Sequence, residues 1–97
     1  MLNKENEVIE WARVRGILDS SDPKSQFIKT VYEMGELADA VNKGENVKDH
    51  VGDVLVTLIL LCYFKSVTLD ECLDVAYEEI KNRKGKMVNG TFIKEVK

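Results

Sequence analysis

Residues 54–64 read VLVTLILLCYF, an eleven-residue run in which Thr57 is the only residue outside the hydrophobic class. A helix with such a run has no polar face, so it must be covered on all sides. The run is too short for a membrane span, which needs about 20 apolar residues. A chain of 97 residues rarely surrounds one of its own helices completely, so a subunit interface is the economical explanation. The run therefore predicts an oligomeric protein built from helices.

The run belongs to a helix that we expect over residues 47–65, with Asn46 as its cap. Upstream, Asp22 and Pro23 are typical of a helix start, and Gly44 is typical of a helix end. A second helix is therefore expected over residues 23–44. Its apolar residues recur at steps of four and three: Phe27, Val31, Met34, Ala38 and Val41.

The two ends of the chain complete the expected fold. A helix is predicted over residues 3–18, and another between a capping box at Thr68 and a stop at Gly85. Asn89-Gly90, placed between short apolar runs, predicts a tight hairpin. The expected fold class is all-α: a four-helix bundle with a short C-terminal β-hairpin, forming one domain over residues 1–97 and assembled as a dimer or tetramer.

Composition narrows the range of partners. There are 14 Lys and Arg residues against 17 Asp and Glu, which gives a net charge of −3. This balance disfavours nucleic acid polymers and anionic membranes as partners. No signal-peptide stretch is visible in the sequence. Cys62 and Cys72 are both interpreted as small buried hydrophobic residues of a protein in a reducing compartment. No disulfide is expected between them. We therefore expect a cytoplasmic protein.

Acidic side chains flank the apolar faces of the two central helices. Glu33 and Glu36 lie three residues apart on one flank, and Asp53 lies on the helix that follows. If the two helices pack antiparallel, the three carboxylates can meet across the seam. Like charges held so close require a hard divalent cation such as Mg²⁺ or Mn²⁺. Spacing alone nevertheless favours the simpler alternative, an ordinary solvated acidic face.

Longer motifs carry a resemblance to a known family. The segments EMGELADAV at 33–41 and HVGDVLVTL at 50–58 resemble the signature of the MazG-like, all-α nucleoside triphosphate pyrophosphohydrolases. WARVRG at 11–16, Gln26, and KNRKGKMVNGTF at 81–92 extend the similarity over nearly the whole chain. The similarity is closest to the short, single-domain members of phages and their hosts.

The resemblance implies a metal site and a reaction. In that family an E-x-x-E pair and an E-x-x-D pair on two helices hold Mg²⁺. Carried over, Glu33, Glu36 and Asp53 would hold the metal, and one of the two glutamates would orient or deprotonate the attacking water. The implied reaction cleaves a nucleoside triphosphate between its α- and β-phosphates and releases a monophosphate and pyrophosphate.

One position departs from the family pattern. His50 stands where the second acidic pair begins with glutamate. Imidazole suits Mn²⁺ or Zn²⁺ better than Mg²⁺, so we expect weaker Mg²⁺ binding. A ligand role for His50 and an exposed residue without a role are equal alternatives. The adjacent Asp49 is a weaker substitute because it points about 100° away around the helix.

Cations and one aromatic residue are the candidates for substrate binding. By similarity to the family, Lys81 and Asn82 are nucleotide contacts, with Arg83 beside them. Lys29 either meets a phosphate or pairs with Glu33. Trp11 can stack on a base, although a tryptophan at helical spacing is more often a core residue. Two rival functions stay open: a degenerate relative that binds a nucleotide or a protein without turnover, and a purely structural helical module.

Overall fold

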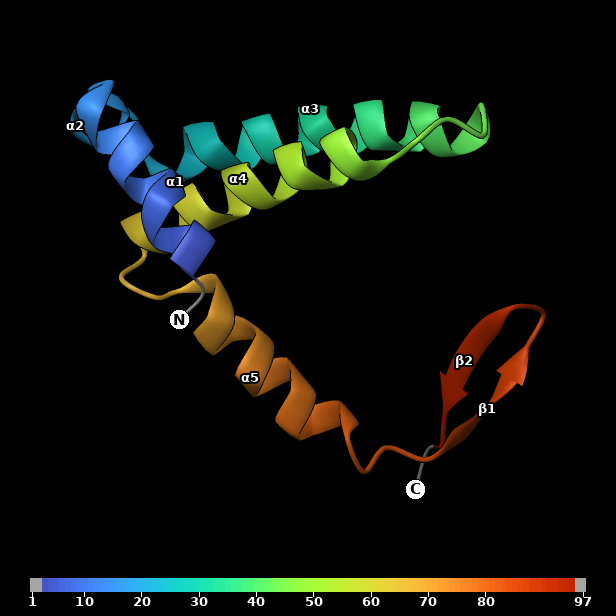
Figure 1. Ribbon diagram of the computed structural model, residues 1–97. Coiled ribbons are helices and arrows are strands. Elements are labelled where there is room, and N and C mark those ends of the chain that lie inside the picture. The colour runs from blue at the N-terminus through green and yellow to red at the C-terminus, as the bar shows by residue number, and fades with distance from the viewer. Residues whose placement is uncertain (1–2, 96–97) are drawn as a thin grey trace.

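The computed structural model describes residues 3–95 and confirms a mostly helical chain with a short C-terminal β-hairpin (Figure 1). The elements are α1 (Asn3–Val14), α2 (Ile17–Ser20), α3 (Pro23–Asn42), α4 (Lys48–Phe64), α5 (Leu69–Ile80), β1 (Gly85–Val88) and β2 (Thr91–Lys94). Helices α3 and α4 pack side by side as an antiparallel pair, and α1 packs against α4 (Figure 1). The two strands pair antiparallel with each other.

Local capping signals start the helices where they were predicted. The Asp22 carboxylate accepts a hydrogen bond from the Ser25 N–H at 2.7 Å, which opens α3. Thr68 and Glu71 form the predicted capping box at the start of α5. Such side-chain bonds satisfy N–H groups that have no partner within the helix. At α4, the Asn46 side chain accepts a hydrogen bond from the Lys48 N–H at 2.9 Å, although Val47 is the N-cap residue.

The prediction of one helix over residues 3–18 is wrong, and the described residues contain five helices instead of four. Gly16 has φ 79°, a left-handed conformation that an α-helix cannot continue through. Glycine adopts this conformation at little steric cost. The chain therefore turns after α1 and restarts as the single-turn helix α2.

The predicted role of Gly85 as a helix stop is also wrong, because α5 ends at Ile80. Gly85 is the first residue of β1 and faces Lys94 across the hairpin. A Cβ atom at this position would lie 2.2 Å from the Ile93 carbonyl oxygen, so the close approach of the strands requires glycine. Asn89 and Gly90 form the predicted turn, with φ 49° and 83°.

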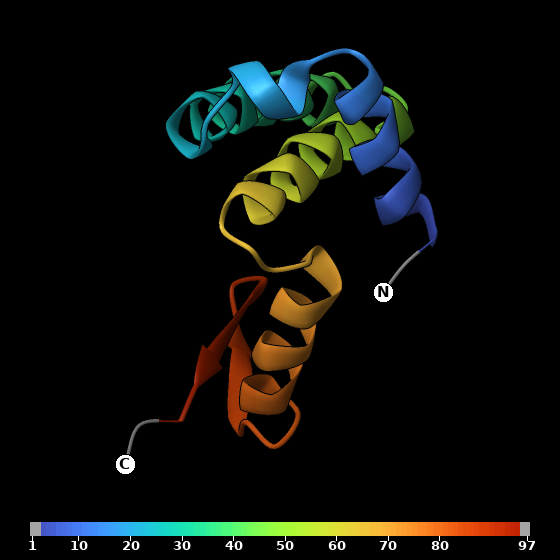
Figure 2. The same ribbon diagram turned by 90° about the vertical axis from the view of Figure 1, so that its left-hand side faces the viewer.

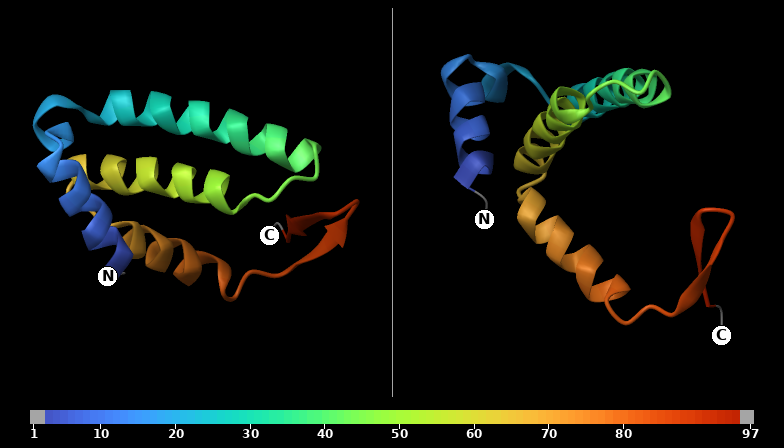
Figure 3. Two further views of the ribbon diagram at one scale, coloured as in Figure 1. Left: turned by 45° about the horizontal axis from the view of Figure 1, so that its top comes forward. Right: turned by 45° about the vertical axis from the view of Figure 1, so that its right-hand side comes forward.

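Helix α5 and the hairpin do not join a bundle. We call residues 69–95 the arm. Ser66 has φ 60°, which is uncommon for a residue with a side chain, and α5 leaves α4 at 97°. Figures 2 and 3 show the arm projecting away from the other helices, and every residue from 71 to 95 is exposed, including Cys72, which was expected to be buried. The predicted four-helix bundle is therefore open in the single chain.

The core lies among α1, α3 and α4 and is small. Its buried apolar residues are Ala12, Ala40, Val54, Ile59, Leu60 and Cys62. The apolar stripe predicted on α3 is not part of this core: Phe27, Val31 and Val41 are 57%, 56% and 60% exposed. Only α4 packs closely along α3 and the arm turns away, so the stripe stays uncovered. Oligomeric assembly remains a prediction.

No single helix within residues 3–95 is both long and apolar enough to cross a membrane; α4 and α5 would pass on length and composition only as a pair bent by 97°.

Candidate active site

A buried polar contact sets how α3 and α4 lie against each other. Thr30 Oγ1 donates a hydrogen bond to Thr57 Oγ1 at 2.8 Å, and both residues are buried. The Thr57 hydroxyl in turn donates to the Val54 carbonyl oxygen at 2.7 Å. Because the helices run antiparallel, the turn after Thr30 lies opposite the turn before Thr57. Glu33 lies in the turn after Thr30, and Asp53 lies in the turn before Thr57.

Glu33 and Asp53 line one pocket with a volume of about 500 Å³, bounded by α1, α3 and α4. Pockets of this size suit a small molecule. Its full lining is Glu7, Val8, Trp11, Lys29, Glu33, Asp53, Val56 and Thr57. The pocket therefore brings together four residues that were predicted from the sequence as candidate site residues. They are Trp11 of α1, Lys29 and Glu33 of α3, and Asp53 of α4.

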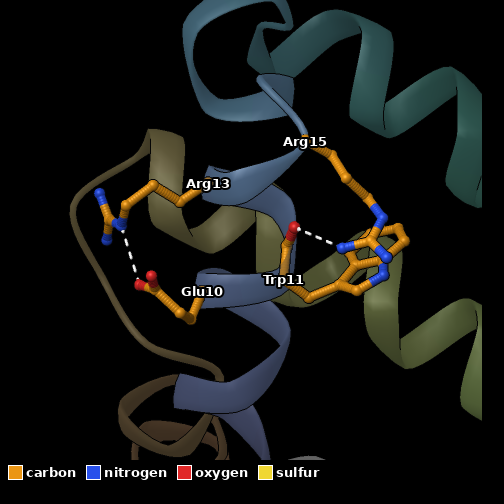
Figure 4. A network of polar contacts seen from close by, with 4 residues as sticks. All are labelled: Glu10, Trp11, Arg13 and Arg15. Carbon is orange, nitrogen blue, oxygen red and sulfur yellow. Dashed lines mark hydrogen bonds and ion pairs between the residues drawn. The ribbon is translucent and has the colours of Figure 1, made fainter.

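Trp11 forms a wall of this pocket and is 44% exposed, so its alternative placement in the core is wrong. The Arg15 guanidinium stands 4.7 Å from the indole ring centroid, a cation–π distance, and Arg15 Nη1 donates to the Trp11 carbonyl oxygen at 3.3 Å (Figure 4). Glu10 and Arg13 pair at 3.1 Å on another side of α1 (Figure 4). The Arg15 guanidinium thus contacts the indole at the wall of the pocket.

Glu36 is not among the residues that line the pocket. It lies about 60° around α3 from Glu33, next to Tyr32. The negative charge of Glu36, and then a hydrogen bond to it, raise the pKa of Tyr32, and Glu33 adds to this effect. The Glu36 side chain is exposed and lies on the same flank of α3 as Glu33.

His50 and Asp49 also lie outside the pocket lining, in the first turn of α4. His50 is half-buried and Asp49 is exposed. Within residues 3–95, no group of three or more His, Cys, Asp or Glu side chains is close enough to hold one metal ion. The expected meeting of Glu33, Glu36 and Asp53 is thus reduced to Glu33 and Asp53 at one pocket, because Glu36 is not part of its lining.

Two carboxylates are still a donor set that fits Mg²⁺. This ion takes oxygen ligands, keeps several waters, and is commonly bound by one or two carboxylates together with substrate phosphates. Glu33 and Asp53 supply oxygens from two facing helices, and Lys29 supplies a cation on the same lining. The residues present therefore suit a metal that binds together with a phosphate-bearing ligand.

Lys81, Asn82 and Arg83 follow the end of α5 on the exposed arm, and none of them lines the pocket. Lys81 Nζ pairs with Glu78 at 2.7 Å. The right view of Figure 3 shows this part of the arm separated from the α3–α4 pair. A single chain does not bring these three residues to the carboxylates.

Two residues of α1 and two of α4 line the pocket without having been predicted from the sequence: Glu7, Val8, Val56 and Thr57. Glu7 lies four residues before Trp11, so the two share a flank of α1. That spacing was visible in the sequence. The role of Thr57 was also visible in principle, since it is the one polar residue in the apolar run.

The fold and pocket define a class: an all-α protein whose antiparallel helix pair presents carboxylates to a small-molecule pocket. A family model, the MazG nucleotide pyrophosphohydrolase domain, matches residues 22–88, more than half of the chain. The chain therefore belongs to this family. The match runs from the N-cap of α3 to the end of β1 and includes the acidic residues of both helices and the basic residues after α5.

Among curated proteins, the chain is similar to an uncharacterized 18.2 kDa protein in the rep-hol intergenic region of Haemophilus phage HP1. The two are 41% identical over 54 residues, which cover 54% of this chain and 33% of the phage protein. The chain thus spans about a third of the length of this curated relative. The similarity is consistent with a phage-type member of the family. No solved structure matches the chain.

Proposed function

We propose that this chain hydrolyses a nucleoside triphosphate to a monophosphate and pyrophosphate, with Mg²⁺ held by carboxylates of α3 and α4. The observation that carries the proposal is the pocket in which Glu33 and Asp53 meet Lys29 and Trp11. Membership in the MazG nucleotide pyrophosphohydrolase family supports the same reaction. Mn²⁺ is the alternative metal because of His50.

Each pocket residue has a separate task in this proposal. Glu33 and Asp53 hold the metal, which when bound neutralises phosphate charge and lowers the pKa of a coordinated water. Lys29 Nζ binds a phosphate oxygen, and the exposed indole of Trp11 stacks on the base. A carboxylate oxygen of Glu36 or Glu33 orients the attacking water and accepts its proton.

The triphosphate tail needs more cations than the pocket supplies. Its lining holds Glu7, Glu33 and Asp53 against Lys29 alone. We assign the additional contacts to Lys81, Asn82 and Arg83 of a neighbouring subunit in a cytoplasmic homodimer or homotetramer. The open α3 stripe and the exposed arm support such an assembly, since both leave apolar side chains uncovered.

The test is pyrophosphate release from a panel of nucleoside and deoxynucleoside triphosphates, with Mg²⁺ and then Mn²⁺. Asp53→Asn and Glu33→Gln should each lower kcat/KM at least about a hundredfold, because each removes a charged ligand at nearly constant shape. Asp49→Asn is the matched control, since Asp49 is exposed on the same helix and outside the pocket. It should stay within about threefold of the wild type.

Two results would contradict the proposal. Full activity of the Asp53→Asn variant would show that the pocket takes no part in the reaction. Nucleotide binding without pyrophosphate release under either metal would leave a binding module in place of an enzyme.

A further inference from the structure

Two cysteine side chains meet where α4 ends and α5 begins. Cys62 Sγ lies 3.9 Å from Cys72 Sγ, although the two residues belong to different helices. Both are free thiols; Cys62 is buried, whereas Cys72 is exposed. Within residues 3–95, no third His, Cys, Asp or Glu side chain joins them to form a metal site. The chemistry of the pair is therefore that of two adjacent thiols.

Backbone hydrogen bonds in the connection between the helices hold the two cysteines in place. The Cys62 carbonyl oxygen accepts a hydrogen bond from the Val67 N–H at 3.0 Å, and Ser66 between them has φ 60°. A left-handed residue with such a bond back to the last turn is a common helix ending. The Cys72 N–H donates to the Thr68 carbonyl oxygen at 3.1 Å, which fixes Cys72 in the first turn of α5. Local backbone geometry thus sets the separation of the two sulfur atoms.

The gap that remains between the sulfur atoms is small. A disulfide bond is about 2.05 Å long, so the atoms have to approach each other by about 2 Å. A change of χ1 rotamer moves a cysteine sulfur by about this distance or more. Because Cys72 is exposed, its side chain has solvent beside it in which to rotate.

The two thiols differ in reactivity. Burial, followed by the hydrogen bond to Cys72, raises the pKa of Cys62 to about 11, and the negative charge of Glu5 adds a smaller effect. The thiolate is the nucleophile in thiol–disulfide exchange, so a thiol that stays protonated and buried reacts slowly with an oxidant from solvent. Cys72 is therefore the thiol that an oxidant meets first.

We propose that Cys62 and Cys72 form a reversible intramolecular disulfide in the folded chain, by exchange with a low-molecular-weight disulfide such as oxidised glutathione. The Cys72 thiolate attacks one sulfur of the oxidant, the S–S bond of the oxidant breaks, and one glutathione thiolate leaves. Cys62 then loses its proton to solvent and attacks the Cys72 sulfur, which releases the second glutathione thiolate. Both leaving thiolates take up a proton, and two electrons have passed from the protein to the oxidant.

The disulfide restrains the origin of the arm. It closes a ring that contains Ser66, where the chain turns by 97° between α4 and α5. Disulfides in a reducing compartment are usually transient and often serve to sense oxidants. The pair thus couples the redox state of the surroundings to the mobility of the arm. This proposal does not depend on the catalytic activity.

The test is equilibration of the full chain in glutathione buffers of increasing oxidised fraction, followed by an acid quench and mass spectrometry. At half oxidation, the squared concentration of reduced glutathione divided by that of oxidised glutathione gives the effective concentration of the two thiols. It should be at least about tenfold higher in the folded chain than in concentrated urea, because the fold places the sulfur atoms together. An equal or lower value in the folded chain, or loss of helix content on oxidation, would overturn the proposal.

Two variants test the order of attack. Cys62→Ser removes the second thiol, so a mixed disulfide of Cys72 with glutathione should accumulate. Cys72→Ser leaves only the buried thiol, which should react with oxidised glutathione at least about tenfold more slowly than Cys72 does. Circular dichroism checks folding, and alanine replaces serine at position 62 if helix content falls. Faster reaction at Cys62 than at Cys72 would contradict the assigned order.

Amide exchange tests the restraint on the arm. Oxidation should slow exchange at Val67 and Leu69 at least about tenfold, since both amides open when the start of α5 moves away, and dithiothreitol should reverse the change. The Cys72→Ser variant in the same buffers is the control and should show no slowing. Unchanged exchange in the oxidised wild type would show that the disulfide does not restrain the arm.

Discussion

Glu5 of α1 joins the arm to the rest of the molecule: its Oε2 accepts a hydrogen bond from the backbone N–H of Leu69, the first residue of α5. Glu5 is only 1% exposed, and its Oε1 has no partner among the described residues. The carboxylate satisfies an N–H that the helix cannot, and its charge suits the positive end of the α5 dipole. One buried side chain of α1 thus anchors the start of an otherwise exposed helix.

Glu5→Ala should therefore loosen the arm. Removing the acceptor leaves the Leu69 N–H without its partner and should lower the free energy of unfolding by about 1–3 kcal/mol. Amide exchange at Leu69 should accelerate more than at Ile59, which lies in the core. Glu10→Ala is the control, because Glu10 is an exposed residue of the same helix. Equal exchange at Leu69 in the wild type and Glu5→Ala would contradict this role.

The contact between Thr30 and Thr57 should appear as coupling in a double-mutant cycle. Thr30→Val or Thr57→Val alone removes one side of a buried hydrogen bond and should lower the free energy of unfolding by about 0.5–1.5 kcal/mol. Replacing both with valine removes both polar groups, so the loss should be smaller than the sum of the two single losses. Urea unfolding measures all four proteins. Strict additivity would show that the contact does not hold α3 against α4.

The two cysteines should differ in reactivity with pH. Cys62 Sγ lies 3.9 Å from Cys72 Sγ, and burial, followed by the hydrogen bond to Cys72, raises the pKa of Cys62 to about 11. At pH 8 only about one Cys62 in a thousand is then a thiolate, the form that reacts with iodoacetamide. Cys72 is exposed and should be alkylated first.

Raising the pH from 8 to 10 should accelerate alkylation of Cys62 about a hundredfold, since the thiolate fraction rises tenfold per pH unit below the pKa. Mass spectrometry of the two cysteine peptides follows each rate. Circular dichroism at both pH values checks that the chain stays folded. Alkylation of Cys62 as fast as Cys72 at pH 8 would show that its thiol is not protected.

Features that depend on neighbouring residues were predictable from the sequence. Asp22 and Thr68 mark helix starts through bonds to N–H groups three residues away, so no distant contact decides them. The meeting of Glu33 and Asp53 followed from two helices, a short loop and antiparallel packing. Gly16 was visible as a glycine inside a helical pattern, although the pattern of apolar residues continued past it.

Features that depend on the direction of the arm could not be predicted. The apolar stripe of α3 has the spacing of a core face, yet Met34 is 50% exposed because α5 turns away after Ser66. The spacing of the apolar residues in α3 does not predict the φ of 60° at Ser66, where the chain turns away from α4. Likewise, Glu36 lies only one turn from Glu33, and whether it joins Asp53 at the pocket depends on the rotation of α3 against α4. Tertiary packing decides both outcomes.

His50→Glu tests the one departure from the family's acidic pattern. The substitution restores an oxygen ligand and a negative charge one turn before Asp53, so Mg²⁺ should bind more tightly and the ratio of Mn²⁺ to Mg²⁺ activity should fall. Because His50 is half-buried and off the pocket lining, the gain requires its side chain to swing toward Asp53 when metal and nucleotide bind.

The readout is the Mg²⁺ concentration for half-maximal pyrophosphate release, with metal-dependent shifts in melting temperature as a second measure. His50→Gln is the control, since it has an oxygen but no charge and should change both measures less. A fall of Mg²⁺ activity in His50→Glu, with the fold intact, would mean that His50 serves the site as it stands and that the added charge at this position is unfavourable.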